Sequence, residues 1–478
     1  MSLFQRRTRK RARHSERSAR NIQHRRRGVP IAGIALLLLL VSLGGASRNN
    51  LLVQPIVQIG AVIIAAAMLM RPLPDNDTTV GSLRPLAWTL AAVAAFMAAQ
   101  LIPLPPGLWR ALSARDLEAA ITDAAGLTGA WRPLSIVPDN TLSALLGMIV
   151  PAAVLIMYTY TPQRLRGRLM WSIAGVGVIE LLLGLGQLAT GQGVLFFYPR
   201  TVGTVTGLFH NRNHLAIFLG TLPPVFAYIA LSQRDGLDRR EPLWAGFTLA
   251  IALTMFGILL TGSRIGVAVV TLTTIGAGLM VWRTSPRLRA RVSRPTSRRT
   301  QIAVIGASVA ACAALLGLVL ARSDTALTRL SATHLGEEGR VGVLGSLLDL
   351  AIRYLPFGSG FGTFDRAFRI IEPDDKLRLS YLNHAHNDFI EIVIEGGVVS
   401  IVIAVVLATF ALRKAWTAWQ VRSQFDQDRE LARVGSIVAM GLLVGSVSDY
   451  PLRTPMLAGW MALALCLLFT VPGSAARR

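Results

Sequence analysis

Apolar segments dominate this chain and restrict the folds that it can adopt. About 12 of them are long enough to cross the hydrocarbon core of a membrane, which takes roughly 20 residues of helix. Hydrophobic residues make up 52% of the 478 residues, more than an ordinary soluble domain contains. The sequence therefore predicts an all-α polytopic membrane protein. The predicted spans lie near residues 29–46, 52–70, 85–102, 142–160, 168–189, 213–231, 243–261, 264–282, 301–320, 387–411, 432–449 and 454–472.

Basic residues are concentrated on one side of these spans. The net charge of +23 comes from a basic tail at 6–27 and from arginine-rich stretches at 161–168, 232–241, 283–299 and 412–433. With 12 spans, all of these stretches fall on the side of the N-terminus, which is the usual positive charge of the cytoplasmic face. We therefore expect both termini to be cytoplasmic. The tail is expected to contact anionic membrane lipids and no nucleic acid, since no aromatic residues are interleaved with its arginines.

The chain is expected to form one membrane domain with short cytoplasmic ends. We place the basic tail at 1–28, the membrane domain at 29–472 and the C-terminal end at 473–478. The first span is expected to stay in the protein and not to act as a cleaved signal peptide. Because long loops on one face usually carry function, we expect the chemistry on the outer side. Two large outer loops and one of medium length are predicted there, at 103–141, 321–386 and 190–212.

Two arginines mark places where predicted spans reach the outer side. Arg212 stands in GLFHNRNHLAIFLG, between His210 and His214, and Arg264 stands in the turn TGSRIG. A helix N-terminus beside an arginine is suited to bind an anion, because unpaired N–H groups are combined with a permanent charge. The alternative is structural, with asparagines that cap the helix and arginines that reach toward headgroups.

A third motif, GRVGVLGSLLDLAIRYLPFGSGFGTF, runs from Gly339 to Phe364. Its apolar positions follow helical spacing, which predicts an amphipathic helix that lies on the membrane or caps a cavity. Arg340 precedes this helix. The GSGFG that follows is interpreted as a flexible turn, because it lacks the Lys-Ser/Thr ending of a phosphate-binding loop.

The fourth motif, LNHAHNDFIEIVIEGG, places two histidines at the start of an apolar span. Ionisable groups at a membrane boundary are costly to place and are therefore functional candidates. On the following helix, Asp388, Glu391 and Glu395 recur at i, i+3 and i+7 and so share one face. A histidine with a neighbouring carboxylate can act as a general base.

Two other readings of this motif stay open. The pattern His384-x-His386-x-Asp388 imitates the spacing of metal ligands, but the sequence offers no recognisable remote fourth ligand. A structural reading is that the histidines and Asn387 cap the span.

Taken together, the motifs resemble those of the bacterial O-antigen ligase and O-antigen polymerase superfamily. The resemblance rests on GLFHNRNHLA, TGSR-x-G, P-x-G-x-G-x-G-x-F, and HAHND followed by E-G-G, in this order. The loop segment RPLSIVPDNT is also similar to members of that group. The resemblance extends from about residue 130 to 450.

This resemblance implies a multi-spanning (GT-C-like) glycosyltransferase of the bacterial inner membrane, with its active site facing the periplasm. Such enzymes take a glycan from an undecaprenyl diphosphate carrier. Ligases pass it to a hydroxyl of lipid A-core, and polymerases pass it to another lipid-linked glycan. The reaction is expected to invert the anomeric centre and to need no nucleotide sugar, metal or other cofactor.

The resemblance also implies roles for individual residues. The family's conserved arginines correspond to Arg212 and Arg264, and its His-Asn motif corresponds to His386 and Asn387. Two guanidinium groups can stabilise the charge that develops on a departing diphosphate, and a neutral imidazole can take the proton of the acceptor hydroxyl. We expect His386 to be the catalytic base. The substrate-binding candidates are Arg212, Arg264, Arg340, Asn387, His384, Glu395 and His214, and His384, His210 and His214 are the alternative bases.

A transporter of lipid-linked glycans is the alternative from a different class. Transporters carry polar residues near mid-membrane and helix breaks in related halves. Glu180 and Gln187, in the fifth predicted span, are the clear interior polar pair of this sequence. They are equally compatible with polar contacts inside a helix bundle.

Overall fold

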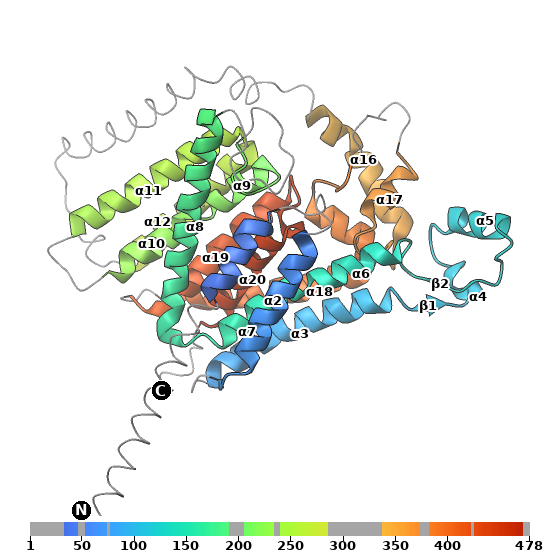
Figure 1. Cartoon of the computed structure of the whole chain (residues 1–478), viewed down its shortest axis with the longest axis horizontal. Helices are drawn as coiled ribbons and strands as arrows, with labels where there is room; N and C mark the ends of the chain where they lie inside the picture. The colour runs from blue at the N-terminus through green and yellow to red at the C-terminus, as the bar shows by residue number, and fades with distance from the viewer. Residues whose placement is uncertain are drawn as a thin grey trace, which may run out of the picture.

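The computed structural model describes residues 33–45, 53–73, 77–190, 205–233, 240–284, 337–372, 382–421 and 425–471. This part of the chain is mostly helical, as predicted (Figure 1). The first helix is Gly33–Leu43. The further elements are α2 (Val53–Leu69), α3 (Asp77–Ala99), β1 (Pro103–Leu104), α4 (Pro106–Trp109), α5 (Asp116–Ala124), β2 (Arg132–Pro133), α6 (Pro138–Gly147), α7 (Ile149–Thr159), α8 (Gln163–Thr190), α9 (Arg212–Gly220), α10 (Pro223–Ser232), α11 (Arg240–Thr261), α12 (Arg264–Thr284), α16 (Glu337–Tyr354), α17 (Phe364–Arg369), α18 (Asp388–Gln420), α19 (Gln427–Ser446), the 3-10 helix η2 (Pro451–Arg453) and α20 (Pro455–Phe469).

Several of these helices fit the thickness of a membrane. Within the described residues, six helical segments are long and apolar enough to cross one: Thr79–Ala99, Pro138–Thr159, Gln163–Thr190, Arg212–Ser232, Arg264–Thr284 and Asp388–Gln420. The protein is therefore a multi-pass membrane protein. Shorter apolar helices are Gly33–Leu43, Val53–Leu69, Gly246–Thr261 and Pro455–Phe469. The total of 12 spans remains a prediction, because the predicted span at 301–320 and the ends 1–28 and 473–478 lie outside the described residues.

One predicted loop is wrong in extent. The basic stretch 412–433 was expected between two spans, but α18 continues to Gln420 and α19 begins at Gln427. Arg413 and Lys414 therefore lie on the last turns of α18. The helix continues because Arg, Lys, Ala and Gln are good helix formers, so the loss of hydropathy marks the end of the apolar part and not the end of the helix.

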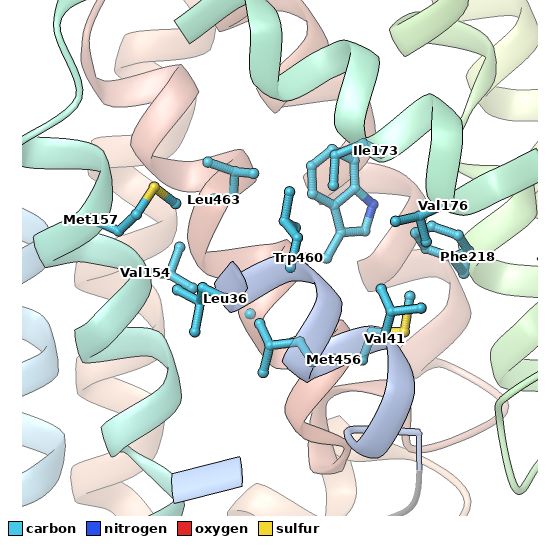
Figure 2. Close-up of a pocket in the computed structure, with 13 residues that line it drawn as sticks. Leu36, Val41, Val154, Met157, Ile173, Val176, Phe218, Met456, Trp460 and Leu463 are labelled. Atoms are coloured by element: carbon cyan, nitrogen blue, oxygen red, sulfur yellow. The ribbon is translucent and has the colours of Figure 1, made fainter. Parts of the chain in front are cut away.

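The centre of the bundle is formed by α19 and α20, which lie side by side (Figure 1). The pair α9 and α12 packs against α19, and α7 packs against α20. A small apolar cavity lies between α7, α8, α9, α20 and the first helix. Figure 2 shows Met456 and Trp460 of α20 lining it together with Leu36 and Val41 of the first helix. This apolar packing gives the polar residues at the ends of these helices a rigid support.

The glycine turn of the third motif is buried and hydrogen-bonded, contrary to the expected flexible turn. Gly358 has a φ of 80°, and a Cβ placed there would lie 2.3 Å from the carbonyl oxygen of Glu395. The N–H of Gly360 donates to the same carbonyl at 3.0 Å. Gly397, at a φ of 56°, interrupts the helical geometry of α18 where the turn meets it. The glycines therefore allow two backbones to approach closely, which no side chain would permit.

Candidate active site

The fourth motif begins α18, and Asn387 is its N-cap. The Asn387 Oδ1 accepts a hydrogen bond from the N–H of Ile390 at 3.0 Å, which satisfies one of the unpaired donors of the first turn. Its Nδ2 donates to the carbonyl of Val447 at 2.9 Å. The capping role that the sequence allowed for Asn387 is thus present. The second bond joins the start of α18 to the end of α19.

His386 precedes this cap in a strained backbone conformation. Its φ is 49°, in the left-handed region that residues other than glycine rarely adopt. Such conformations cost about 1–3 kcal/mol and persist only where the surroundings enforce them, most often at functional sites. The Nδ1 of His386 lies 3.2 Å from Oδ1 of Asp449, and 18% of the side chain is exposed. This backbone conformation directs the imidazole toward a buried carboxylate, and part of the side chain stays exposed.

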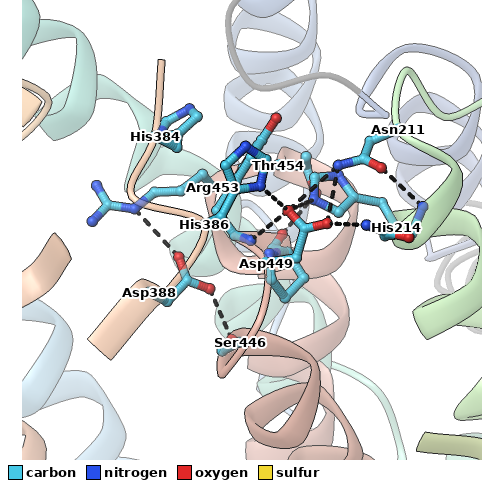
Figure 3. Close-up of polar contacts among 12 residues, drawn as sticks. Asn211, His214, His384, His386, Asp388, Ser446, Asp449, Arg453 and Thr454 are labelled. Carbon is cyan, nitrogen blue, oxygen red and sulfur yellow. Dashed lines mark hydrogen bonds and ion pairs between the residues drawn. The ribbon is translucent and has the colours of Figure 1, made fainter. Parts of the chain in front are cut away.

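Asp449 is the centre of this network and is completely buried. Its carboxylate accepts hydrogen bonds from Nδ2 of Asn213 at 2.6 Å, from Nδ2 of Asn211 at 3.2 Å and from the N–H of Tyr450 at 2.9 Å. The Nε2 of His214 lies 3.6 Å from Oδ1 (Figure 3).

The charge state of Asp449 follows from these contacts. Burial alone would raise the pKa of Asp449, but the interactions with His214 and His386 outweigh it and hold this pKa well below its usual range. A charged carboxylate can only accept hydrogen bonds. It therefore fixes the proton of His386 on Nδ1 and leaves Nε2 to take up another proton.

A second buried network surrounds Arg453. Its Nη1 lies 2.7 Å from Oε2 of Glu395, its Nη2 lies 3.6 Å from Oε1 of Glu391, and its Nε lies 3.6 Å from Oδ1 of Asp388. Burial alone would lower the pKa of Arg453, but the three carboxylates outweigh it and raise this pKa above its usual value. The predicted common face of the three acidic residues is confirmed, because all three approach one guanidinium. Glu395 thus faces Arg453.

His384 belongs to this second network. Its Nδ1 lies 2.8 Å from Oε1 of Glu391, and the N–H of Ala385 donates to Oε2 of the same carboxylate at 2.8 Å. His384 and His386 are therefore directed to different carboxylates. The ring of Tyr450 lies between the networks, with centroid distances of 4.2 Å to His384, 4.9 Å to His386 and 5.0 Å to His214.

Arg212 and Arg264 are the first residues of two helices that pack together, α9 and α12. Gly266 of α12 lies against Ala216 of α9, where an added Cβ would be 2.4 Å from the Ala216 Cβ. The half-buried Arg212 donates from Nη1 to the carbonyl of Thr261 at 3.4 Å, and Arg264 is exposed. Both guanidiniums therefore stand at neighbouring helix N-termini, where the helix dipoles also favour an anion.

The start of α9 is tied to the Asp449 network on both sides of Arg212. Asn211 is the N-cap, with its Oδ1 accepting from the N–H of Asn213 at 2.9 Å, and the Nδ2 groups of both asparagines bind Asp449. The structure thus brings His214 and His386 to one carboxylate, and Arg212 lies in the chain between the two asparagines that bind it. His210 lies just before α9, where burial, and then the charge of His214, lower its pKa.

Glu180 and Gln187 also support this region. The Oε1 of Gln187 accepts from the N–H groups of Thr206 and Gly207 at 2.8 and 3.0 Å, and Oε2 of Glu180 accepts from the N–H of Leu208 at 2.9 Å. The interior polar pair of α8 therefore binds the backbone that leads into α9. These contacts match the bundle reading of the pair.

Two of the central residues, Asp449 and Arg453, were missed by sequence reasoning. Asp449 is the last residue of the predicted span 432–449, and Arg453 lies in the short turn after it. The available signal was the pair of opposite charges in SDYPLR, in the short turn between two apolar segments. The side chain of Arg340, a predicted contact, lies outside the described residues.

Comparison with known proteins finds a family model that matches part of the chain. A search of curated proteins finds no match. The family model of O-antigen ligase matches residues 249–405, a region that includes Arg264 and the fourth motif with His386. The match includes TGSR-x-G, P-x-G-x-G-x-G-x-F and HAHND, and it agrees with the helical membrane architecture. The matched region, about a third of the chain, is similar to the O-antigen ligase family and supports membership of it.

Proposed function

We propose that the protein transfers a glycan from undecaprenyl diphosphate to a hydroxyl of lipid A-core. In this reaction the acceptor oxygen forms a bond to the anomeric carbon on the face opposite the leaving group. The bond from that carbon to the diphosphate oxygen breaks, and the acceptor proton passes to Nε2 of His386. The diphosphate leaves with the bonding electrons, and the configuration of the anomeric carbon is inverted.

The observation that carries this proposal is the His386–Asp449 pair beside Arg212. A base must have its free nitrogen accessible and its tautomer fixed, and Asp449 supplies the second condition while the partial exposure of His386 supplies the first. General base catalysis of this kind typically contributes about 10²–10⁴-fold in rate.

The two arginines fit the leaving group. Arg212 and Arg264 stand at adjacent helix N-termini, so two guanidiniums and two helix dipoles can stabilise the diphosphate as its charge increases. Arg212 is flanked by two asparagines bound to Asp449, which ties the diphosphate position to the position of the base. We propose that Glu395, Asn387 and His384 keep these side chains in position. We propose that His214 contacts Asp449 on the side where the glycan donor binds.

The orientation proposed is an inner-membrane protein with its active site facing the periplasm and both termini in the cytoplasm. The helices α9, α12 and α18 all begin at the site. Basic residues lie at the opposite ends, with Arg283 in the last turn of α12 and Arg413 and Lys414 near the end of α18. This distribution supports a cytoplasmic position of those ends.

A glycan profile of a deletion strain tests the function and separates it from polymerisation. The strain is complemented with wild type, with His386→Ala, or with Asp349→Asn as a control on the exposed side of α16. We expect the deletion strain and the His386→Ala strain to accumulate full-length polymer on its lipid carrier, with none on lipid A-core. Wild type and the Asp349→Asn control should restore transfer to lipid A-core. Loss of chain growth, with single repeat units only, would instead identify a polymerase. A loss of all surface glycan with donor retained on the cytoplasmic side would identify a transporter.

A further inference from the structure

The short helix α5 exposes its large apolar side chains, unlike an ordinary surface helix. Leu117 and Ile121, one helical turn apart, are 44% and 55% exposed, whereas Thr122 is fully buried. Ala120 and Ala124 are exposed on the same side as the two large residues. Surface helices of soluble proteins direct such residues to the core and their polar face to water.

Polar contacts hold the inner side of α5 in place. Arg115 is buried and donates to the carbonyl of Leu134, and its Nη1 lies 3.9 Å from Oε1 of Glu118. Beneath them the buried Trp109 donates from Nε1 to the carbonyl of Ala130 at 2.9 Å. The pairing of β1 with β2 closes the segment 103–133. The outward direction of the apolar face is therefore a feature of a folded unit.

The apolar surface of this unit continues that of a membrane span. The α3 segment Thr79–Ala99 is apolar and largely unburied in the bundle, with Trp88 exposed on it. Ile102, directly after α3, is exposed, and so are Leu108, Leu127 and Trp131 in the unit itself. Figure 1 shows α4, α5 and the two strands beyond the end of α3, away from the other helices. Such a position lies at the level where a span leaves the hydrocarbon, and tryptophan is enriched there.

The face of α5 is by itself too small for a stable contact with a second copy of the chain. A helix of nine residues is about 14 Å long and about 10 Å wide, so its face covers on the order of 140 Å². Stable protein interfaces bury about 800 Å² on each partner. A bilayer has no such minimum, because every exposed apolar side chain that enters it gains independently.

We propose that the segment 103–133 is a membrane-interface unit, in which α5 lies on the outer leaflet with Leu117 and Ile121 among the lipid acyl chains. Asp116 and Asp123, at one edge of the exposed face, then lie at the level of the headgroups and water. The choice of the outer leaflet rests on the orientation proposed above, whereas the lipid contact itself does not depend on glycan transfer. The unit adds a lipid contact outside the bundle to the protein.

Spin labels on the two sides of α5 test the proposal. The full chain, with Cys312 and Cys466 replaced by alanine, is placed in nanodiscs of phosphatidylethanolamine and phosphatidylglycerol. Single cysteines are introduced as Leu117→Cys and Ile121→Cys, and as Asp123→Cys for a matched position on the aspartate edge. Each label is measured for collision with oxygen, which concentrates in acyl chains, and with a water-soluble nickel chelate.

The expected result is that labels at 117 and 121 collide several-fold more with oxygen than with the nickel chelate, and that the label at 123 shows the reverse. Equal access of the nickel chelate to all three labels would overturn the proposal, because α5 would then lie in water. Labels at 117 and 121 that are shielded from both reagents would also overturn it and would indicate a protein partner. In that case, dipolar broadening between labels would identify a second copy.

Discussion

Two histidines that are two residues apart in the sequence meet very different surroundings. His386 contacts Asp449, whose other partners are neutral amides, a backbone N–H and a second imidazole. His384 contacts Glu391, whose charge is balanced by Arg453. Arg453 also contacts the carboxylates of Asp388 and Glu395. In the His386–Asp449 pair, the histidine has a positive φ and a partly exposed side chain. The His384–Glu391 pair lies in a cluster of three carboxylates and one arginine.

These surroundings suit the His386–Asp449 pair to proton transfer and the network of Arg453 to a structural role. Among the described contacts of Asp449 there is no arginine or lysine, so a proton that arrives on His386 supplies the matching positive charge. Around Glu391 that positive charge is already supplied by Arg453. We therefore assign proton transfer to the His386–Asp449 pair and the joining of α18 to η2 to the pair with Arg453.

Removing the cation of the second network has the largest expected effect on stability. Arg453→Met leaves Asp388, Glu391 and Glu395 together without a counter-charge, and loss of one partner of a buried ion pair typically costs about 3–5 kcal/mol. We expect a large fall in unfolding temperature in detergent, with little folded protein recovered. Arg353→Met, at the exposed end of α16, is the control. Near-normal stability of Arg453→Met would remove the structural assignment.

Changing the acid of the first network is expected to affect rate more than stability. In Asp449→Asn the amide group can donate to His386, so the imidazole no longer has to carry its proton on Nδ1 and Nε2 is a poorer base. We expect transfer to fall by about 10²–10⁴-fold, as for a wrongly oriented catalytic histidine. Donor affinity should remain close to wild type, and Asp349→Asn should have no effect. A variant with normal transfer would show that Asp449 does not position the base.

The arginines outside both networks should affect donor binding. Lysine keeps the charge but lacks the planar fork that matches phosphate oxygens. Because hydrogen bonds to charged groups contribute about 1.5–3 kcal/mol, Arg212→Lys and Arg264→Lys should each weaken donor binding by about 10- to 100-fold. Titration with an undecaprenyl diphosphate glycan measures this, with Arg353→Lys as the control. Unchanged donor affinity in both variants would place the diphosphate elsewhere.

The charge of Asp449 should have a smaller effect, which is measured as a change of the unfolding temperature at low pH. Its pKa in the folded protein is held below the unfolded value of about 3.9. Its contribution to stability is therefore complete above about pH 4 and is lost as the pH falls through the folded value. The difference in unfolding temperature between wild type and Asp449→Asn should narrow as the pH falls below about 4. A difference that widens below about pH 4 would contradict the low pKa.

Local signals in the sequence were sufficient for part of the site. The cap at Asn387, the common face of Asp388, Glu391 and Glu395, and the helix starts at Arg212 and Arg264 all follow from residues near one another in the chain. Helical spacing and capping are local rules, so they can be applied without knowing how the helices pack.

The residues that complete the site depend on tertiary packing. Asp449 and Arg453 follow α19, about 60 residues after the histidines, and their importance depends on how α18, α19 and η2 come together. The conformation of His386 is likewise imposed by these contacts, because its own sequence favours a negative φ. The glycine turn is a similar case, since its spacing suggests flexibility and only its contact with α18 explains it.

The most direct test of the account compares His386→Asn with His384→Asn in single-turnover transfer and in donor binding. Asparagine tolerates the left-handed conformation, so the first change removes the base with little added strain. We predict that His386→Asn lowers the transfer rate by about 10²–10⁴-fold with normal donor binding and unfolding temperature. His384→Asn should lower the unfolding temperature and retain most of the transfer rate. Normal transfer by His386→Asn, or selective loss of transfer in stable His384→Asn, would contradict the account.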